Sequence, residues 1–280
     1  MSGRRRKKRK SRFFLKLIKS RSFWLALVGA GMLAGLAYLF FVSHVFEVQE
    51  LDVSGNEEVK EGAILQAAEG SIEKRVGVGP FTIFITKSIF LVGPSQLEDV
   101  LMRLSPHIGR VEVSKKLPGT IKLEIEERQP FAEICILSGE CYKADKKGIV
   151  FEKSADVKKQ AEADVEVFQV ERADLVIRVR ESTRYELGKE AVQPLYLLGV
   201  KQVREKIKNN SRIEAGELLL EEDKLVVSTL RGLKLYFDLD KDIDDQLFNL
   251  DLVLREKITD EKLEELEYID LRFGNRIYYK

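Results

Sequence analysis

Residues 111–132, VEVSKKLPGTIKLEIEERQPFA, decide the fold of this chain. Polar and apolar side chains alternate over residues 111–114 and again over residues 120–126, and a period of two is typical of β-strands with one buried face. Between them lie Leu117, Pro118 and Gly119, where Pro presets one backbone torsion and Gly relaxes the next. The stretch therefore predicts two strands joined by a tight turn.

The residues before this hairpin predict one more strand and two helices. Residues 46–53 alternate like a strand and end in a Ser-Gly-Asn turn, and residues 57–68 carry apolar side chains at helical spacing. A second helix is predicted over residues 94–104, after a Gly-rich stretch at 70–79 and an apolar run at 83–92. The predicted order is strand, helix, helix, strand, strand.

Four blocks of this region form a recognisable series. They are VSGN at 53–56, IFLV at 89–92, VEVSKKLPGT at 111–120 and EERQPFA at 126–132. Through them, residues 46–134 resemble the membrane-proximal POTRA domain of the bacterial cell-division proteins of the FtsQ/DivIB family. Leu117 departs from the family, which usually has an aromatic residue before this Pro. The resemblance implies a POTRA domain, which we place at residues 46–130.

Residues 131–280 predict a mixed β domain. Strands are predicted at 134–137, 142–145, 148–151, 165–168, 175–179, 225–229 and 233–237, and helices at 193–208 and 242–255. The resemblance extends to YKADKKGIVF at 142–151 and YIDLRF at 268–273. The expected fold class is α+β: an N-terminal transmembrane helix, a β-α-α-β-β POTRA domain, and a mixed β domain with two flanking helices and a C-terminal edge strand.

The N-terminal region predicts a single-pass membrane anchor. Residues 23–42, FWLALVGAGMLAGLAYLFFV, are almost wholly apolar, and 20 helical residues match a hydrocarbon core of about 30 Å. No small-x-small cleavage site follows, so we expect an uncleaved transmembrane helix over residues 23–43. Eleven Lys or Arg and no acid lie in residues 1–21, which predicts a cytoplasmic tail at 1–22 and an extracytoplasmic remainder.

The tail also raises the question of what its cations bind. The whole chain has 47 basic and 46 acidic residues, so the excess positive charge is confined to the tail. Polybasic arms bind nucleic acid as well as anionic lipid. Beside a membrane helix, topology and lipid attraction account for the charge, so we expect membrane lipid and no nucleic acid as the partner of the tail.

No motif predicts catalysis, a metal site or a cofactor. Ser71 and Lys74 match the S-x-x-K string of penicillin-recognising enzymes, but no S-D-N or K-T-G partner is present. Two Cys and two His are too few for a Cys/His zinc cluster. The acids at positions 238, 240, 242, 244 and 245 imitate a calcium loop, but Ile243 replaces its Gly and Asn249 its Glu. We therefore interpret them as the acidic first turn of a helix.

Cys135 and Cys141 flank a Ser-Gly turn and face an oxidising compartment if the predicted topology holds. Two interpretations stay open at this point. The cysteines form a disulfide across a hairpin, or they are two small buried residues.

The C-terminus predicts a partner-binding edge. Residues 268–273 and 276–280 read as two strands around Gly274 and Asn275, and no later strand covers the last one. We expect the partner-binding residues to be Arg272, Phe273, Asn275, Ile277 and Tyr278. The alternative is that Phe273 and Ile277 are only core residues and that Lys280 blunts the edge.

The resemblance implies a non-enzymatic divisome scaffold in the bacterial cytoplasmic (inner) membrane, of single-pass type II topology and located at the division septum. It implies that the scaffold recruits FtsB/DivIC- and FtsL-type single-span proteins, contacts other membrane divisome proteins through its POTRA domain, and regulates septal peptidoglycan synthesis. Two alternatives remain. One is a membrane-anchored envelope enzyme acting on cell-wall glycan, and the other is a POTRA-bearing secretion or outer-membrane assembly factor, which would need tandem POTRA repeats or a barrel.

Overall fold

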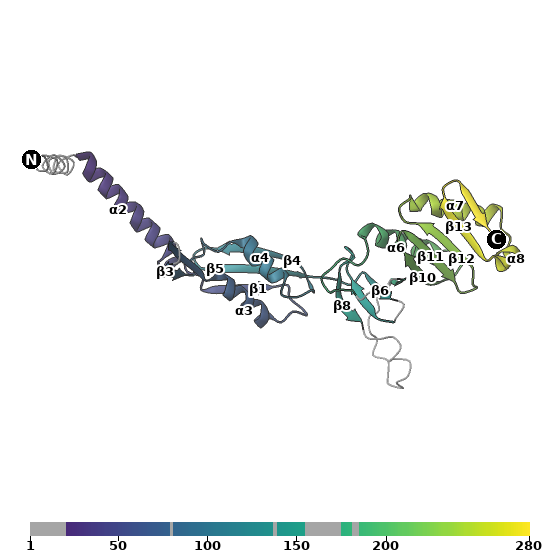
Figure 1. The fold of residues 1–280 in the computed structure, drawn as a ribbon, viewed down its shortest axis with the longest axis horizontal. Helices are drawn as coiled ribbons and strands as arrows, with labels where there is room; N and C mark the ends of the chain where they lie inside the picture. The colour runs from purple at the N-terminus through teal and green to yellow at the C-terminus, as the bar shows by residue number, and fades with distance from the viewer. Residues whose placement is uncertain (1–20, 79–80, 137–138, 155–174, 181–184) are drawn as a thin grey trace, which may run out of the picture. The chain divides into compact units, whose positions relative to one another are not determined.

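The computed structural model describes residues 21–78, 81–136, 139–154, 175–180 and 185–280 (Figure 1). These residues form two compact units, one that ends at Leu104 and also takes in Arg110–Glu126, and one made of Ser105–Gly109 and Glu127–Lys280. Each unit is described by itself. The basic tail predicted at 1–22, except for its last two residues, and the strand predicted at 165–168 lie outside the described residues.

Helix α2 spans Arg21–Phe41 and buries none of its side chains within the protein. Arg21 is its only charged residue, and α2 is the one helix of the described ranges that is long and apolar enough to cross a membrane. Its observed bounds lie two residues before the predicted ones. A short 3-10 helix, η1 at His44–Phe46, follows, and the hydroxyl of Ser43 accepts the N–H of Val45 at its start.

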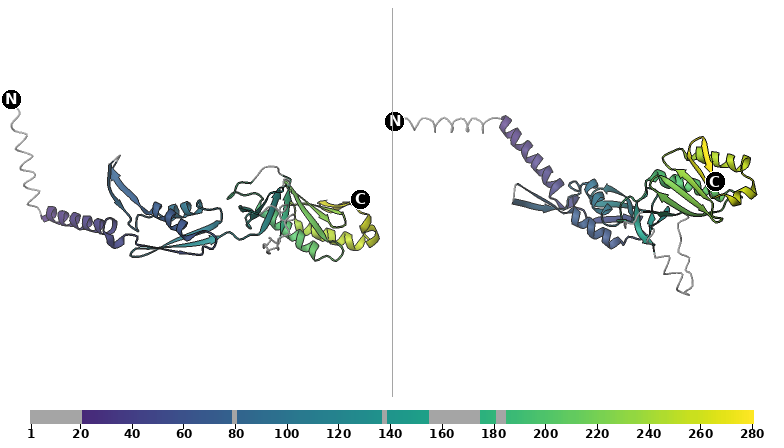
Figure 2. Two further views of the ribbon diagram at one scale, coloured as in Figure 1. Left: turned by 90° about the horizontal axis from the view of Figure 1, so that it is seen from below. Right: turned by 45° about the vertical axis from the view of Figure 1, so that its right-hand side comes forward.

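The first unit contains a three-stranded sheet with two helices on one face (Figure 2). Its elements are β1 Glu50–Ser54, α3 Glu61–Ile72, α4 Pro94–Met102, β4 Ile108–Lys116 and β5 Thr120–Glu127. The sheet order is β1-β5-β4, with β1 parallel to β5. Alternate residues of β5 are buried, as the alternating pattern predicts, and Ile64 of α3 and Leu101 of α4 are fully buried as well. The predicted order of strand, helix, helix, strand, strand is confirmed.

A hairpin that the sequence did not predict lies between the two helices. It consists of β2 at Lys74–Val78 and β3 at Phe81–Thr86, which pair antiparallel with a register shift at Val76 and Gly77. We interpreted residues 70–79 as a Gly-rich interruption because glycine weakens the strand signal. The apolar run at 83–92 is therefore divided, with β3 ending at Thr86 and the following residues forming a turn.

The second unit is built on a nine-stranded mixed sheet in the order β14-β13-β12-β11-β10-β9-β6-β7-β8. The strands are β6 Ala132–Ile136, β7 Cys141–Ala144, β8 Val150–Ser154, β9 Val176–Val179, β10 Ala215–Glu221, β11 Lys224–Thr229, β12 Lys234–Asp238, β13 Tyr268–Phe273 and β14 Arg276–Tyr279. Cys135 and Cys141 lie directly opposite each other on β6 and β7 and are joined in a disulfide. Of the two open interpretations, the structure contains the disulfide.

Three helices cover one face of this sheet (Figure 2). They are α6 Pro194–Lys208, α7 Ile243–Glu256 and α8 Asp260–Glu265. Leu197 of α6, Leu250 of α7 and Phe237 of β12 belong to the shared core. Two helices were predicted; α8 is additional, and its six residues are too few to show helical periodicity. Strand β10 was also not predicted, because its Leu-Leu-Leu run does not alternate.

A buried ion pair lies at the start of the second unit and links two of the sequence blocks quoted above. The guanidinium of Arg128 contacts the carboxylate of Asp145, and both side chains are almost fully buried. The Nε of Arg128 also donates to the carbonyl of Pro106 at 3.0 Å. Asp145 in turn accepts the main-chain N–H groups of Lys147 and Ile149 and so closes the turn between β7 and β8. Arg128 and Asp145 therefore have a structural role.

Candidate functional site

Strand β14 lies at one end of the nine-stranded sheet and pairs only with β13 among the described strands. Tyr268 and Lys280 exchange both of their main-chain hydrogen bonds, at 3.3 and 3.2 Å. Paired residues of antiparallel strands alternate between hydrogen-bonded and non-hydrogen-bonded positions, so the N–H groups of Tyr279 and Ile277 point away from β13. The outer side of β14 therefore offers main-chain donors to an added strand.

Two exposed aromatic side chains lie beside this edge. Phe273 is 54% exposed and Tyr278 is 48% exposed, and their rings contact edge to face with centroids 5.2 Å apart. Asn275 is exposed in the turn between β13 and β14. Ile277 is partly buried and packs against the core. The alternative that Phe273 and Ile277 are only core residues therefore agrees with the partly buried side chain of Ile277 but not with the exposed side chain of Phe273.

In the alternative interpretation, Lys280 blunts the edge. Its ammonium lies 3.1 Å from the carboxylate of Glu267, in an ion pair in which both side chains are exposed. Such surface pairs contribute little to stability. The last residue of the chain therefore engages its own domain through both its main chain and its side chain.

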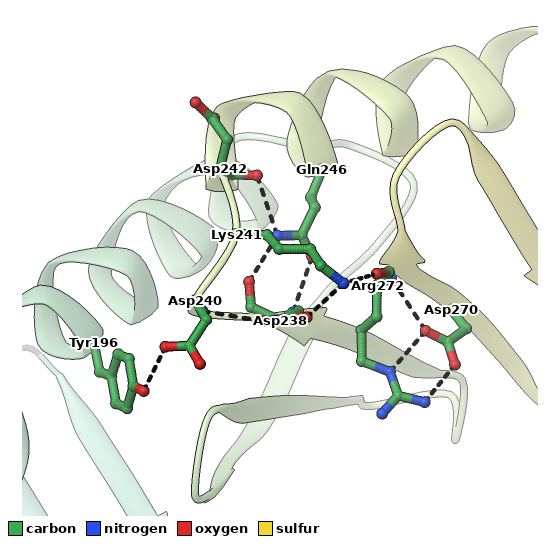
Figure 3. Close-up of polar contacts among 8 residues, drawn as sticks. All are labelled: Tyr196, Asp238, Asp240, Lys241, Asp242, Gln246, Asp270 and Arg272. Carbon is green, nitrogen blue, oxygen red and sulfur yellow. Dashed lines mark hydrogen bonds and ion pairs between the residues drawn. The ribbon is translucent and has the colours of Figure 1, made fainter.

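Arg272 is engaged within the domain. Its Nε and Nη2 donate to the two carboxylate oxygens of Asp270 at 2.9 and 2.7 Å (Figure 3). Its guanidinium also lies 5.5 Å from the ring centre of Tyr236 and 5.7 Å from that of Phe273. An acidic residue of a partner would have to compete with Asp270 for this cation. The expected pairing of Arg272 with a partner therefore stays a prediction.

The pair alters the ionisation of both groups. Burial by itself raises the pKa of Asp270, but the hydrogen bonds from the guanidinium and the main-chain N–H of Arg272 outweigh it and leave that pKa below its ordinary value. The charge of Lys224 acts in the same direction. The hydrogen bond to Asp270 correspondingly raises the pKa of Arg272. Asp270 is therefore held as a carboxylate beside the edge.

This pKa shift predicts a pH-dependent contribution to stability. Because the folded-state pKa of Asp270 is lowered, its stabilisation is present above the ordinary carboxyl pKa of about 3.9 and is lost as the pH falls through the lower folded value. We expect Asp270→Asn to lower the free energy of unfolding at pH 7, and the difference from wild type to shrink below about pH 4. Urea unfolding of wild type and Asp270→Asn at a series of pH values measures this difference in the free energy of unfolding. A difference that stays constant down to pH 3 would contradict the assignment.

Several residues that support the edge were not predicted as site residues. The ammonium of Lys241 lies between the carboxylate of Asp238, at 2.8 Å, and the main-chain carbonyl of Arg272, at 2.7 Å (Figure 3). The amide of Asn249 donates to the carbonyl of Gly274 at 3.2 Å. These bonds hold α7 and the loop before it against the turn from which Phe273 projects. Their only signal in the sequence was the acidic run, which we had compared with a calcium loop.

Of the acids in that run, only Asp244 and Asp245 lie in the first turn of α7, as we predicted; Asp242 is its N-cap, Asp240 lies in the loop before it, and Asp238 ends β12. Asp242 accepts the N–H of Asp245 at the start of α7, where carboxylates also interact favourably with the helix dipole. The buried amide of Gln246 bonds both the N–H and the carbonyl of Asp238, at 2.9 and 2.8 Å. Asp240 accepts the hydroxyl of Tyr196 at 2.6 Å, and this hydrogen bond is the main reason that the pKa of Tyr196 is raised to about 12 (Figure 3).

The S-x-x-K string does not form a catalytic pair in the structure. Ser71 lies in α3, and its hydroxyl donates to the carbonyl of Ala67 at 3.1 Å. Lys74 donates to the side chain of Gln96 at 2.8 Å. Each residue is therefore satisfied by a different neighbour.

The comparisons with known proteins agree with the first unit of the structure. A family model described as "POTRA domain, FtsQ-type" matches residues 82–128. The match covers most of β3, α4, β4 and β5, and β1 and α3 complete the same unit on its N-terminal side. No curated protein matches the chain. POTRA domains of the FtsQ type occur in a family of non-enzymatic division proteins. The chain therefore contains a POTRA domain of the FtsQ type, behind an apolar helix suited to anchor it in a membrane, and this domain supports a role in cell division.

Proposed function

We propose that this protein is a divisome scaffold that recruits FtsB/DivIC- and FtsL-type single-span proteins to the septum and so regulates septal peptidoglycan synthesis. The observation that carries the proposal is the outer side of β14, where outward main-chain N–H groups lie beside the exposed rings of Phe273 and Tyr278. An extended segment of a partner would add to this edge by main-chain hydrogen bonds, and the aromatic rings would select its side chains.

The POTRA domain serves as the second docking surface in this proposal. Only residues 42–49, which include η1, connect α2 to the first strand of the sheet, so the domain is held next to the bilayer. That position favours contacts with other membrane-embedded divisome proteins. The basic tail adds attraction to anionic lipid on the cytoplasmic side.

The proposal requires a cytoplasmic N-terminus. We expect a reporter enzyme that is active only outside the cytoplasm to be active when fused after Lys280 and inactive when fused before Ser2, because the cations of the tail precede the helix. Neutralising Arg4, Arg5 and Arg6 together with the other cations of residues 4–12 should weaken this orientation. Activity of the fusion before Ser2 alone would reverse the topology and remove the proposal.

Imaging with depletion tests the cellular role directly. A fluorescent fusion should form bands at mid-cell in growing cells, and depletion of the protein should produce filamentous cells because septation stops. An even distribution around the membrane, with normal division after depletion, would exclude a divisome scaffold.

The second candidate is an envelope enzyme acting on cell-wall glycan. The observation in its favour is that the carboxylates of Asp223, Asp238 and Asp240 lie within 4.8 Å of one another, near the short separations that glycosidases use. Against it, Asp238 binds Lys241 and Asp240 accepts the hydroxyl of Tyr196, so both acids already hold the loop. Release of glycan fragments by the purified protein, and loss of that release in Asp223→Asn, would support the enzyme.

A further inference from the structure

The junction between α2 and the POTRA domain is built around three phenylalanine rings from separate segments. Phe40 is on α2, Phe46 is on η1, and Phe90 is in the turn between β3 and α4. The ring centroids are 5.3 Å apart for Phe40 and Phe46, 5.3 Å for Phe40 and Phe90, and 5.2 Å for Phe46 and Phe90. The end of the apolar helix is therefore in direct contact with a turn of the folded domain.

The same turn caps the helix. The last four carbonyls of an α-helix have no partner within the helix. Here the hydroxyl of Ser88 donates to the carbonyl of Phe40 at 2.7 Å, and the hydroxyl of Thr86 donates to the carbonyl of Phe41 at 2.8 Å. Ser88 is buried. Two side chains more than 40 positions away in sequence thus end the helix, which ties its direction to the domain.

Main-chain hydrogen bonds reinforce this attachment. The N–H of Ile89 donates to the carbonyl of Phe46 at 2.9 Å, and the N–H of Val48 donates to the carbonyl of Lys87 at 3.0 Å. The segment after α2 is therefore paired with the turn that carries Phe90. A free linker would lack this pairing.

Helix length sets the depth of the ring cluster. From Ser22 to Phe41 the helix is about 30 Å long, which equals the thickness of a hydrocarbon core. With Arg21 at one boundary, Phe40 reaches the opposite boundary, where the apolar faces of interfacial segments carry Trp, Phe and Leu. Because Phe90 touches Phe40, it lies at the same level.

The outer surface of the junction carries exposed apolar side chains next to the exposed side chains of His44 and Lys87. Phe90 is 40% exposed, and Val42 and Val45 are also exposed. At the boundary of a bilayer this surface would face lipid rather than water, so no further protein is needed to cover it.

We propose that the POTRA domain rests on the membrane through the turn at residues 87–91, with Phe90 inserted among the phospholipids of the outer leaflet, so that α2 and the domain move as one body. The occupant of this surface is the phospholipid interface itself. The inference requires α2 to span the bilayer but does not depend on a role in division. It makes the turn around Phe90 a membrane-binding site of the domain.

Depth-dependent fluorescence quenching tests the proposal on the full chain. The chain has a single Trp, Trp24, so Trp24→Phe provides a silent background for a new reporter. Phe90→Trp in this background is reconstituted into phosphatidylcholine vesicles whose acyl chains carry bromine near the headgroup. We expect strong quenching and a blue-shifted emission for this indole. Both signals should stay the same when the ratio of protein to lipid in the vesicles is lowered.

Leu104→Trp in the same background is the matched control. Leu104 is 38% exposed, close to the value for Phe90. It precedes the start of β4, whereas the end of β4 leads into the turn at Gly119, whose carbonyl accepts the N–H of Gln49 close to the junction. Its indole should emit as in water and resist the brominated lipid. Val45→Trp is a second reporter at the junction should Phe90→Trp fail to fold. Unquenched emission from a folded junction reporter, or equal quenching of the Leu104→Trp reporter, would overturn the proposal.

The rigid attachment has its own test. Thr86→Val together with Ser88→Ala removes both hydroxyl caps while the apolar helix stays intact. Hydrogen exchange of the reconstituted protein should then become faster for the amides of residues 42–48, because the junction opens. Exchange at the wild-type rate in this variant would show that the caps do not hold the helix to the domain.

Discussion

Ile277→Pro should abolish the capture of a strand-adding partner and leave the domain folded. The N–H of Ile277 points away from β13, so proline removes a donor that only an added strand would use. Edge strands tolerate proline on their solvent side. The variant loses the hydrogen bond from the N–H of residue 277 to the partner, and the proline ring stands in the path of the added strand. Together these changes should weaken binding at least about tenfold, which corresponds to about 1.4 kcal/mol.

Two further variants separate the main chain from the side chains. Ile277→Ala removes the same partly buried side chain but keeps the N–H, so it should retain most of the binding. Phe273→Ala should weaken binding without unfolding the domain, because this ring is more than half exposed. Titration of the full chain in detergent with an FtsB/DivIC-type partner, alongside circular dichroism, measures all three. Full capture by a folded Ile277→Pro protein would rule out strand addition at this edge.

Arg128→Ala should cause a large loss of stability in the second unit. The mutation leaves the buried carboxylate of Asp145 without its cation, and breaking a buried ion pair from one side costs about 3–5 kcal/mol. It also removes the hydrogen bond to the carbonyl of Pro106. A domain is stable by only about 5–15 kcal/mol, so this one change removes a large share of the total. The free energy of unfolding in urea is the measurement.

Arg231→Ala is the control for this prediction. Arg231 pairs with Glu264, but both side chains are 68% exposed, and exposed pairs contribute about 0–1 kcal/mol. The two variants remove the same side chain from the same unit and differ in burial. Equal losses of stability for Arg128→Ala and Arg231→Ala would show that burial of the Arg128 pair contributes nothing.

Local sequence patterns were sufficient for the elements whose side chains repeat with a clear period. The alternation of residues 120–126 predicted β5, and the apolar spacing at 242–255 predicted α7. Patterns that were short or rich in glycine were insufficient. Strand β2 contains Gly77, which interrupts the alternation, and α8 is shorter than two helical turns.

Part of the candidate site was also readable from the sequence. The turn at Gly274 and Asn275 predicted the β13–β14 hairpin. Asp270 and Arg272 share one face of β13 because they are two residues apart. Their ion pair was therefore within reach of sequence reasoning but was missed, since Arg272 was considered only as a partner contact. The hydrogen bond from Lys241 to the carbonyl of Arg272 could not be predicted from the sequence, because these residues are separated by 31 positions.

By itself the sequence determined the apolar span, the order of the POTRA elements and the identity of the final strand, because these features depend on composition and on periods of two or 3.6 residues. The tertiary structure alone decided which distant segments pair. It placed β1 parallel to β5, buried Arg128 against Asp145, and set the hydroxyls of Thr86 and Ser88 against the end of α2. Such contacts depend on how the helices and strands pack, since main-chain and polar groups that leave water must find partners wherever the fold places them.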